Sequence, residues 1–299
     1  MNLHTPAAPA GVEITQTIAN SPGYWSTVGS RLMRDKVTLF FGFLLLAIIL
    51  AAIFAPLISP TDPYKTNILR RLKDIGYPGH PLGTDQTGRD MLARLLYGGR
   101  LSLFMGVTPV AIALLIGGLL GVLAGYAGGA LNMAIMRTMD IFYAFPSVLL
   151  AIAISGALGA GIGNAILSLS VVFIPPIARV AETITTQVRT LDYVEAARAS
   201  GAGSLRIIRI HVLSNVLGAI FVYATSLISV SIILASGLSF LGLGTKPPEP
   251  EWGLMLNELR QAIYVAPYVA ALPGVMIFLT SLSFNLLSDG LRSAMDLKS

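Results

Sequence analysis

The sequence predicts an all-α membrane protein with six transmembrane helices. Of its 299 residues, 54% are hydrophobic and only 12% are charged, whereas a soluble domain carries about 25% charged residues. So much apolar surface requires contact with lipid. Lys, Arg, Asp and Glu are absent from five long windows, which are 37–61, 101–136, 141–178, 210–245 and 261–288.

The lengths of these windows set the number of spans, because about 20 apolar residues cross a bilayer as a helix. The window 141–178 is too long for one span, and four glycines from Gly156 to Gly163 interrupt it. We therefore expect this window to hold the end of one span and most of the next. The predicted helices lie at 37–58, 101–125, 131–156, 163–186, 214–238 and 267–289.

The spans divide the chain into a small first part and a larger core. Residues 1–36 hold prolines and polar residues but no apolar signal-peptide region, so we expect a mobile tail. The first span is followed by a long loop over residues 59–100, and the other five spans form a core over residues 101–289. Residues 290–299 form a second tail on the same side as the first.

Composition excludes several functional classes. The net charge of +5 is small and its basic residues are scattered, so nucleic acid binding is not indicated. The chain has no cysteine, which excludes disulfides and thiol chemistry. Its histidines, His4, His80 and His211, are too far apart in the sequence to predict a metal site.

Three glycines recur every four residues in the second predicted span. Gly117, Gly121 and Gly125 therefore share one helix face. Small residues at this spacing allow two helices to approach closely. Packing within the chain is favoured over contact with another subunit.

The end of the long loop has the pattern of an amphipathic helix over residues 83–103. Asp85–Arg89 and Asp90–Arg94 are two i,i+4 pairs beside an apolar stripe, and Gly98–Gly99 is expected to end the helix. We expect this helix to lie at the membrane interface, where each exposed pair contributes only a few tenths of a kcal/mol. The segment serves either as structural support or as a gate or docking surface.

A charged hairpin over residues 192–215 interrupts the apolar segments. Asp192 is predicted to cap a helix that starts at Tyr193, with Glu195 at the capping-box spacing. Gly201 suits the left-handed position after that helix, and Ser204 is predicted to cap a second one.

The second helix of this hairpin is expected to place Leu205, Ile208 and Val212 on one face. Such a rigid hairpin at a membrane surface offers a binding surface to a soluble partner. The alternative is an ordinary amphipathic surface hairpin without a partner. A DNA-reading helix-turn-helix has a similar outline, but the flanking spans argue against it.

The spans show no device for energy coupling. Their ionisable residues lie near predicted ends, where Arg137–Asp140 and Arg179–Glu182 are interpreted as local i,i+3 pairs. A proton- or sodium-coupled carrier usually places such groups within its spans. The chain also lacks a G-x-x-x-x-G-K-[ST] phosphate loop, and the sequence predicts no catalytic residue.

The fifth predicted span and the loop after it hold further candidates. Thr225, Ser229 and Ser236 share one helix face, where they either line a polar pathway or bond to helix backbone. Prolines over residues 247–250 forbid a continuing helix, and Trp252 suits a membrane interface. A surface loop explains this last segment as well as a ligand site does.

Five motifs resemble one family of membrane proteins. Glu195-Ala196-Ala197 followed by Gly201 resembles the EAA loop of ABC importer permeases, with Ser214 where the family has proline. The other four stretches resemble the C-type permease subunit of dipeptide/oligopeptide importers. They are GTDQTGRD at 83–90, MDIFYAFPSVL at 139–149, SFLGLGTKPPEPEWG at 239–253 and FNLLSDGLRSAMD at 284–296.

The resemblance implies a type I ABC importer permease fold and a non-catalytic subunit in a bacterial inner membrane. It implies a second permease, two ATP-binding subunits that hold ATP and Mg, and an extracytoplasmic solute-binding protein. It places the hairpin and both tails in the cytoplasm and residues 59–100 outside. The implied ATPase-coupling residues are Glu195, Ala196, Ala197, Gly201, Ala202 and Arg206.

Two alternatives to a peptide importer remain open. Related systems carry nickel, glutathione, opines or oligosaccharides. A self-sufficient channel or ion-coupled carrier is the second alternative, which the lack of mid-membrane charges and the hairpin motif argue against.

Overall fold

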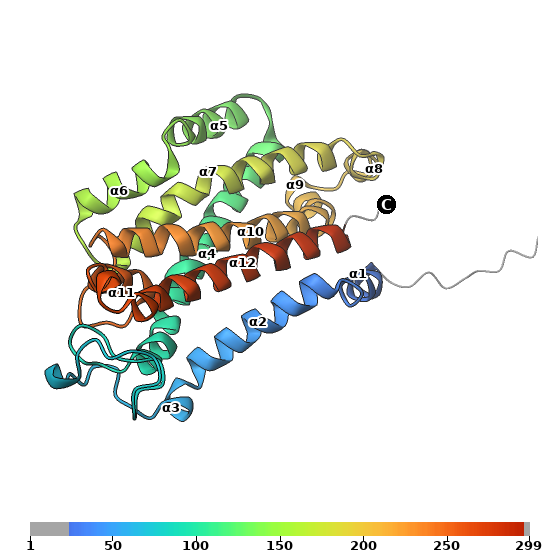
Figure 1. Cartoon of the computed structure of the whole chain (residues 1–299). Helices are drawn as coiled ribbons and strands as arrows, with labels where there is room; N and C mark the ends of the chain where they lie inside the picture. Colours follow the sequence, from blue (N-terminus) through green and yellow to red (C-terminus); the bar gives the residue numbers. More distant parts are fainter. Residues whose placement is uncertain (1–23, 296–299) are drawn as a thin grey trace, which may run out of the picture.

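The computed structural model describes residues 24–295 as a bundle of long helices (Figure 1). Residues 1–23 and 296–299, which belong to the two predicted tails, lie outside the described residues. Within the described part there is no β-strand, only two isolated bridges in the loop after the first span. The predicted all-α fold is confirmed.

Five helices of the described chain are long and apolar enough to cross a membrane, and a bent pair makes a sixth crossing if it counts as one span. The five are α2 (Lys36–Ile53), α4 (Met91–Ala127), α7 (Ile162–Arg189), the run Ser204–Phe240 and α12 (Pro267–Met295). The bent pair is α5 (Gly129–Tyr143) with α6 (Ser147–Leu158). Each predicted span therefore has a counterpart.

The predicted span 131–156 is not one continuous helix. Its two halves, α5 and α6, meet at an angle of 86°. Pro146 is the N-cap of α6, and a proline both lacks an N–H donor and disfavours helix at the residue before it. The prediction of one unbroken helix was wrong, because it was based on the apolar composition of the segment, which does not reveal this break.

The helix α4 begins ten residues before the predicted second span. It starts after Asp90, whose carboxylate accepts a hydrogen bond from the Ala93 N–H at 2.7 Å. Gly98–Gly99 does not end the helix, and no separate interfacial helix forms over 83–103. A Cβ at Gly98 would overlap the Pro250 carbonyl oxygen, so the glycine serves close packing inside the helix.

Both predicted tails carry helix. Residues Tyr24–Leu32 form α1, which packs against α12. Asp35 then caps α2 through the Val37 N–H at 3.0 Å. At the other terminus, α12 continues to Met295, so the expected tail from residue 290 is helical as far as the structure describes it.

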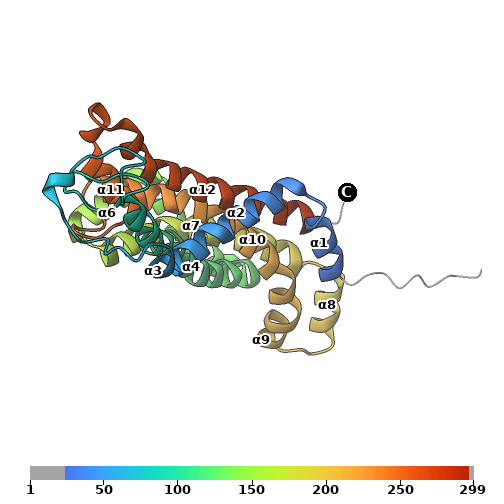
Figure 2. The same ribbon diagram turned by 60° about the horizontal axis from the view of Figure 1, so that its bottom comes forward.

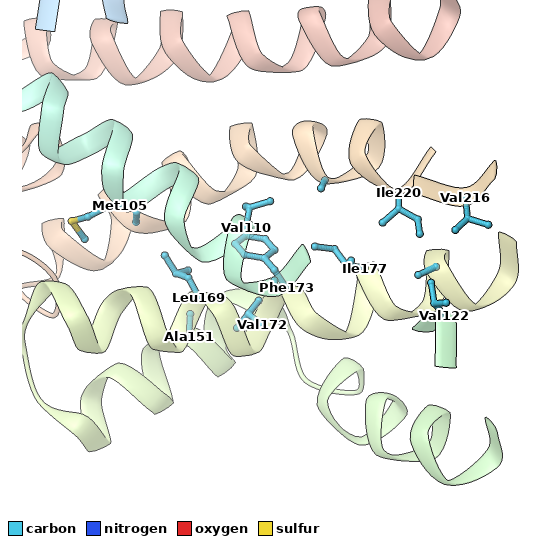
Figure 3. Packing of buried hydrophobic residues seen from close by; sticks show 14 of the residues in the cluster. Met105, Val110, Val122, Ala151, Leu169, Val172, Phe173, Ile177, Val216 and Ile220 are labelled. Carbon is cyan, nitrogen blue, oxygen red and sulfur yellow. The ribbon is translucent and has the colours of Figure 1, made fainter. Parts of the chain in front are cut away.

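The core lies between α4, α7 and α10 (Leu213–Phe240). Figure 3 shows Val110, Phe173 and Ile177 gathered between the ribbons of this cluster. The predicted glycine face of α4 lies against α7, as expected for packing within the chain. A Cβ at Gly121 would overlap the Ala178 carbonyl oxygen and approach the Ala181 Cβ to 2.6 Å.

The two ends of the bundle carry different structures (Figures 1 and 2). One end carries α1, the end of α12 and the hairpin helices α8 (Asp192–Ala199) and α9 (Ser204–Ile207). The opposite end carries the short helices that cap the bundle. They are α3 (Ala55–Ile58), η1 (Ile68–Arg70), α11 (Trp252–Leu259) and η3 (Ala262–Tyr264).

We expect Gly121→Ala to lower the free energy of unfolding by about 1–3 kcal/mol, because α4 and α7 must separate to admit the methyl group. Gly118→Ala is the matched control, since a Cβ there meets nothing within 4 Å. The measurement is thermal unfolding of the purified protein in detergent. Equal melting temperatures for the two variants would contradict close backbone contact at Gly121.

Candidate functional site

The hairpin at one end of the bundle forms as predicted, with different caps. Leu191 is the N-cap of α8, so Asp192 is the first helical residue and not the cap. Gly203 likewise precedes α9, which starts at Ser204. Gly201 has a φ of +80°, which confirms the predicted left-handed turn.

The second hairpin helix does not end as a separate element. A π-helical turn, η2 (Ile208–Val212), joins α9 to α10. Serine at position 214 leaves a backbone N–H available, where a proline would have none. The hairpin is therefore a direct extension of a spanning helix.

The buried face of the hairpin differs from the predicted one. Val194, Ile207 and Val212 are buried and join the core cluster. Leu205, which was expected to share the face of Val212, is 80% exposed. The π-helical turn changes the angular spacing, so a simple helical periodicity fails here.

The predicted coupling residues divide into an exposed and a half-buried set. Ala197 and Ala202 are half-buried and pack against the core, and the Ala202 N–H donates to the Ala197 carbonyl at 3.1 Å. The side chains of this pair therefore shape the hairpin. The exposed set is Glu195, Ala196, Gly201 and Arg206.

A recess of about 610 Å³ separates the hairpin from the ends of α4 and α7. Arg189 donates to the Tyr126 carbonyl at 3.0 Å and ties the two helix ends together beneath it. Glu195 lines the recess from the hairpin side. The full lining is Tyr126, Ala127, Arg189, Thr190, Glu195, Arg198 and Ser204.

At the opposite end, the four charged residues of the two predicted i,i+4 pairs are buried, not exposed. Asp85, Arg89, Asp90 and Arg94 each have at most 4% of their surface exposed. Asp85 and Arg89 lie in the loop before α4, so their i,i+4 spacing is not on a helix. The expectation of weak surface pairs was wrong, because α11 covers this segment.

A carboxylate from α11 completes this charge cluster. One Glu258 oxygen accepts from Arg89 and from Arg94, at 2.8 Å in each case. Asp85 pairs with Arg89 and lies 3.5 Å from the Arg94 Nε. Two guanidinium groups thus neutralise two carboxylates, as buried charges require. We name Asp85, Arg89, Arg94 and Glu258 the outer charge cluster.

The predicted Asp90–Arg94 pair does not form. Asp90 caps α4, and its second oxygen lies 2.8 Å from the His80 Nδ1. Arg94 instead donates to the Pro248 carbonyl at 3.3 Å as well as to Glu258. Both arginines therefore hold segments that are more than 150 residues away in sequence.

A further buried carboxylate, Glu251, is a residue that the sequence did not single out. It caps α11 by accepting from the N–H groups of Gly253 and Leu254, and it accepts from the Ser102 hydroxyl of α4. Burial raises the pKa of this carboxyl, and the two backbone hydrogen bonds oppose the rise. Its only sequence signal is an acidic residue directly before an apolar run.

Trp252 does not lie at a membrane interface. It is 1% exposed, and its indole N–H donates to the Leu95 carbonyl at 2.9 Å. The ring packs beside Gly99, where a Cβ would approach it to 3.1 Å. The prolines before it place the tryptophan inside the cap and not at the lipid boundary.

The three predicted pathway hydroxyls on α10 bond or pack within the chain. Thr225 donates to the Val222 carbonyl at 2.7 Å, and Ser229 donates to the Ser226 carbonyl at 2.8 Å. Ser229 and Ser236 are buried. This geometry agrees with the alternative of backbone-bonded hydroxyls, and a pathway role stays a prediction.

One of the two predicted local ion pairs is replaced by a contact between helices. Arg179 of α7 pairs with Asp140 of α5, not with Glu182. Arg137 lies 3.7 Å from the same Asp140 carboxylate. Glu182 instead accepts from the Asn132 amide at 2.7 Å, because α5 lies beside α7.

Comparison with known families accounts for most of the chain. Residues 117–298 match the family described as "Binding-protein-dependent transport system inner membrane component". Residues 23–74 match the family described as "N-terminal TM domain of oligopeptide transport permease C".

Curated relatives share about two fifths of their residues with this chain. The glutathione transport system permease protein GsiD of Pectobacterium atrosepticum is 41% identical over 274 residues, 92% of this chain and 91% of the relative. The dipeptide transport system permease protein DppC of Alkalihalophilus pseudofirmus is 40% identical over 296 residues, 99% and 96% of the two chains. The di/tripeptide transport system permease protein DppC of Pseudomonas aeruginosa is 42% identical over 259 residues, 85% and 86% of the two chains.

A solved structure shares the fold. A chain of the inward-facing MetNI methionine ABC transporter superposes with a TM-score of 0.56 and 21% identity. The match covers 68% of this chain and 97% of that chain. The likeness agrees with the type I importer permease fold predicted from the sequence.

We expect Asp85→Asn to lower the free energy of unfolding by about 3 kcal/mol, because it leaves Arg89 and Arg94 with one carboxylate between them. Asp74→Asn, in the exposed part of the same loop, should change it by less than about 0.5 kcal/mol. Chemical unfolding in detergent measures both. A small effect of Asp85→Asn would mean that the outer charge cluster does not hold the cap.

The raised pKa of Glu251 predicts a pH dependence. The folded state takes up a proton at higher pH than the unfolded state, so the stabilising contribution of the residue is lost as pH rises through the folded pKa. The wild-type protein should therefore gain stability relative to Glu251→Gln when the pH is lowered from neutral toward the ordinary carboxyl range. Melting temperatures of both proteins across this range test the sign, and a difference that stays constant would refute it.

Proposed function

Because this chain belongs to the family of binding-protein-dependent transport system inner membrane components, we propose that it is a permease subunit of an ATP-driven importer for short peptides. It forms half of the translocation pathway, and a second, related permease forms the other half. The observation that carries this proposal is a hairpin that extends a spanning helix beyond the bundle at the end shared by α1 and α12.

The hairpin is the part of the chain through which the conformational change of the ATPases reaches the permease. Its buried residues fix it to the core through Val194 and Ile207. Its exposed residues include Glu195, Ala196 and Arg206, which are free to contact a soluble subunit. Because α9 continues into α10, a push on the hairpin is transmitted directly to a spanning helix and to the pathway.

ATP and Mg bind to two partner subunits, and this chain acts without catalysing a reaction itself. A solute-binding protein delivers the ligand on the extracytoplasmic side, and closure of the ATPases drives alternating access. The chain lies in a bacterial inner membrane with both termini and the hairpin in the cytoplasm. The outer charge cluster supports the cap from within, so delivery involves exposed cap residues and not Asp85 or Arg94 directly.

Short peptides are the ligand class that the relatives favour. Their names include dipeptide, di/tripeptide and glutathione transport, and glutathione is itself a modified tripeptide. The test is uptake of labelled Gly-Gly and glutathione by proteoliposomes that contain the full importer assembled from its neighbouring genes. Uptake without ATP, or by this chain alone, would contradict the proposal.

Coupling through the hairpin predicts a loss of ATPase association in Ala196→Trp, because the bulky ring occupies the exposed face of α8. Gly201→Ala should reduce substrate-stimulated ATP hydrolysis, because a Cβ at a φ of +80° costs about 1 kcal/mol in this turn. Gly203→Ala is the matched control, with open space and an ordinary φ of −66°.

Co-purification of the ATPase subunits and hydrolysis in the reconstituted complex are the measurements for these variants. Membrane insertion should be unchanged in all three, because none of the changes touches a span. Wild-type association and hydrolysis in Ala196→Trp and Gly201→Ala would show that coupling occurs elsewhere.

Topology gives an independent prediction, since the native chain has no cysteine. Cysteine introduced at Thr66 or Lys246, both exposed on the cap, should react with an impermeant maleimide added to intact cells. Cysteine at Ser204 in the hairpin should be protected until the membrane is opened. Labelling at position 204 from outside would reverse the proposed orientation.

A further inference from the structure

The break between α5 and α6 opens a pocket that none of the predicted site residues explains. Its volume is about 330 Å³, within the range of small-ligand sites. Residues near the middle of α7 and α10 form its walls, among them Val172 and Phe173, which Figure 3 labels. The full lining is Phe142, Tyr143, Phe145, Ser147, Leu150, Val172, Phe173, Pro176, Tyr223, Leu227 and Val230.

Aromatic rings dominate the pocket. Three come from the break itself, namely Phe142, Tyr143 and Phe145, and they are 37%, 55% and 57% exposed. Because α6 leaves the break at 86° to α5, these rings do not pack into a continuous helix face. They leave a site with apolar walls that is open on one side.

A pair of oppositely charged side chains lies beside the pocket, and its exposure indicates the surroundings of the pocket. The Arg179 guanidinium lies 4.9 Å from the centre of the Tyr143 ring and pairs with Asp140. The two charged side chains are 47% and 41% exposed on helices that otherwise cross the membrane. Charges on spanning helices usually pair with one another and face the bundle interior or a water-filled cavity, because lipid solvates them poorly.

The charge pair beside the pocket disfavours a lipid chain as its occupant. A polar rim beside apolar walls matches a ligand with charged ends and an apolar side chain. The pocket also lies where the helix is discontinuous, which is where transporters commonly place their ligand sites. The first helical residue of α6, Ser147, is part of the lining, so the start of this helix borders the pocket.

We propose that this pocket is a side-chain subsite of the translocation pathway, which holds an apolar side chain of a short peptide in transit. Asp140 and Arg179 at its rim attract the charged amino and carboxyl ends of the same ligand. The subsite rests on the proposed peptide function and adds to it a preference among peptides. A peptide without side chains leaves the aromatic walls unused.

The test compares uptake of Phe-Phe and Gly-Gly by proteoliposomes that contain the complete importer. Val230→Trp places a large ring in the pocket wall. We expect it to lower the Phe-Phe to Gly-Gly uptake ratio about tenfold, the order of effect that one altered apolar pocket gives. Ile233→Trp is the matched control, because Ile233 is exposed on α10 but does not line the pocket. It should keep the wild-type ratio.

The rim is tested separately with Asp140→Asn. It should reduce uptake of both dipeptides to a similar degree, because both carry the same charged ends. A purely structural role of Asp140 would instead lower the amount of assembled complex, which co-purification of the second permease and the ATPases measures. Reduced uptake with normal assembly supports the subsite.

The remaining outcomes overturn one proposal or the other. An unchanged uptake ratio in Val230→Trp, with normal assembly, overturns the subsite and leaves the peptide function intact. Loss of the second permease from the Val230→Trp complex, but not from Ile233→Trp, shows that the partner permease fills the pocket, and this also overturns the subsite. Wild-type proteoliposomes that accumulate neither dipeptide contradict the peptide function itself.

Discussion

The close approach of α4 and α7 is the contact on which the rest of the bundle depends. Gly117, Gly121 and Gly125 leave no side chain at its centre, so the backbones meet and dispersion contacts accumulate along both helices. In a membrane this matters more than in water, because lipid is as apolar as the helix surfaces and gives no hydrophobic drive for association. α5, α6 and α10 all pack against α7, so this contact positions the aromatic pocket as well as the hairpin.

The end of the bundle opposite the hairpin is held by a different set of contacts. There, a second apolar cluster, which includes Met91, Trp252 and Leu259, packs beside buried charges that join long loop segments. Arg89, in the loop before α4, and Arg94, in the first turn of α4, both bind Glu258 of α11, and Glu251 adds a link from α11 to Ser102. Buried ion pairs often add little net stability, but removing one partner is costly. The cap is therefore well defined in geometry and sensitive to single charge changes.

The break between α5 and α6 lies outside these two anchors. Its aromatic residues are exposed, and its charged residues, Asp140 and Arg179, bind each other across two helices. The hairpin lies at the end of the same bundle and joins α10, which also forms a pocket wall. The second helix of the hairpin and a wall of the pocket therefore belong to one helical run, Ser204–Phe240.

The sequence by itself determined the five continuous spans, the glycine contact and the left-handed turn at Gly201, because each depends on local composition or on one residue's backbone freedom. The hairpin motif and the family followed from short motifs. Only the tertiary structure showed that the helix bends before Pro146 and that this bend is a candidate site. It also decided the burial of the charges around Arg94, because their partner Glu258 lies 164 residues away. Spacing along a helix predicts neighbours on that helix, but it cannot predict which distant segment covers them.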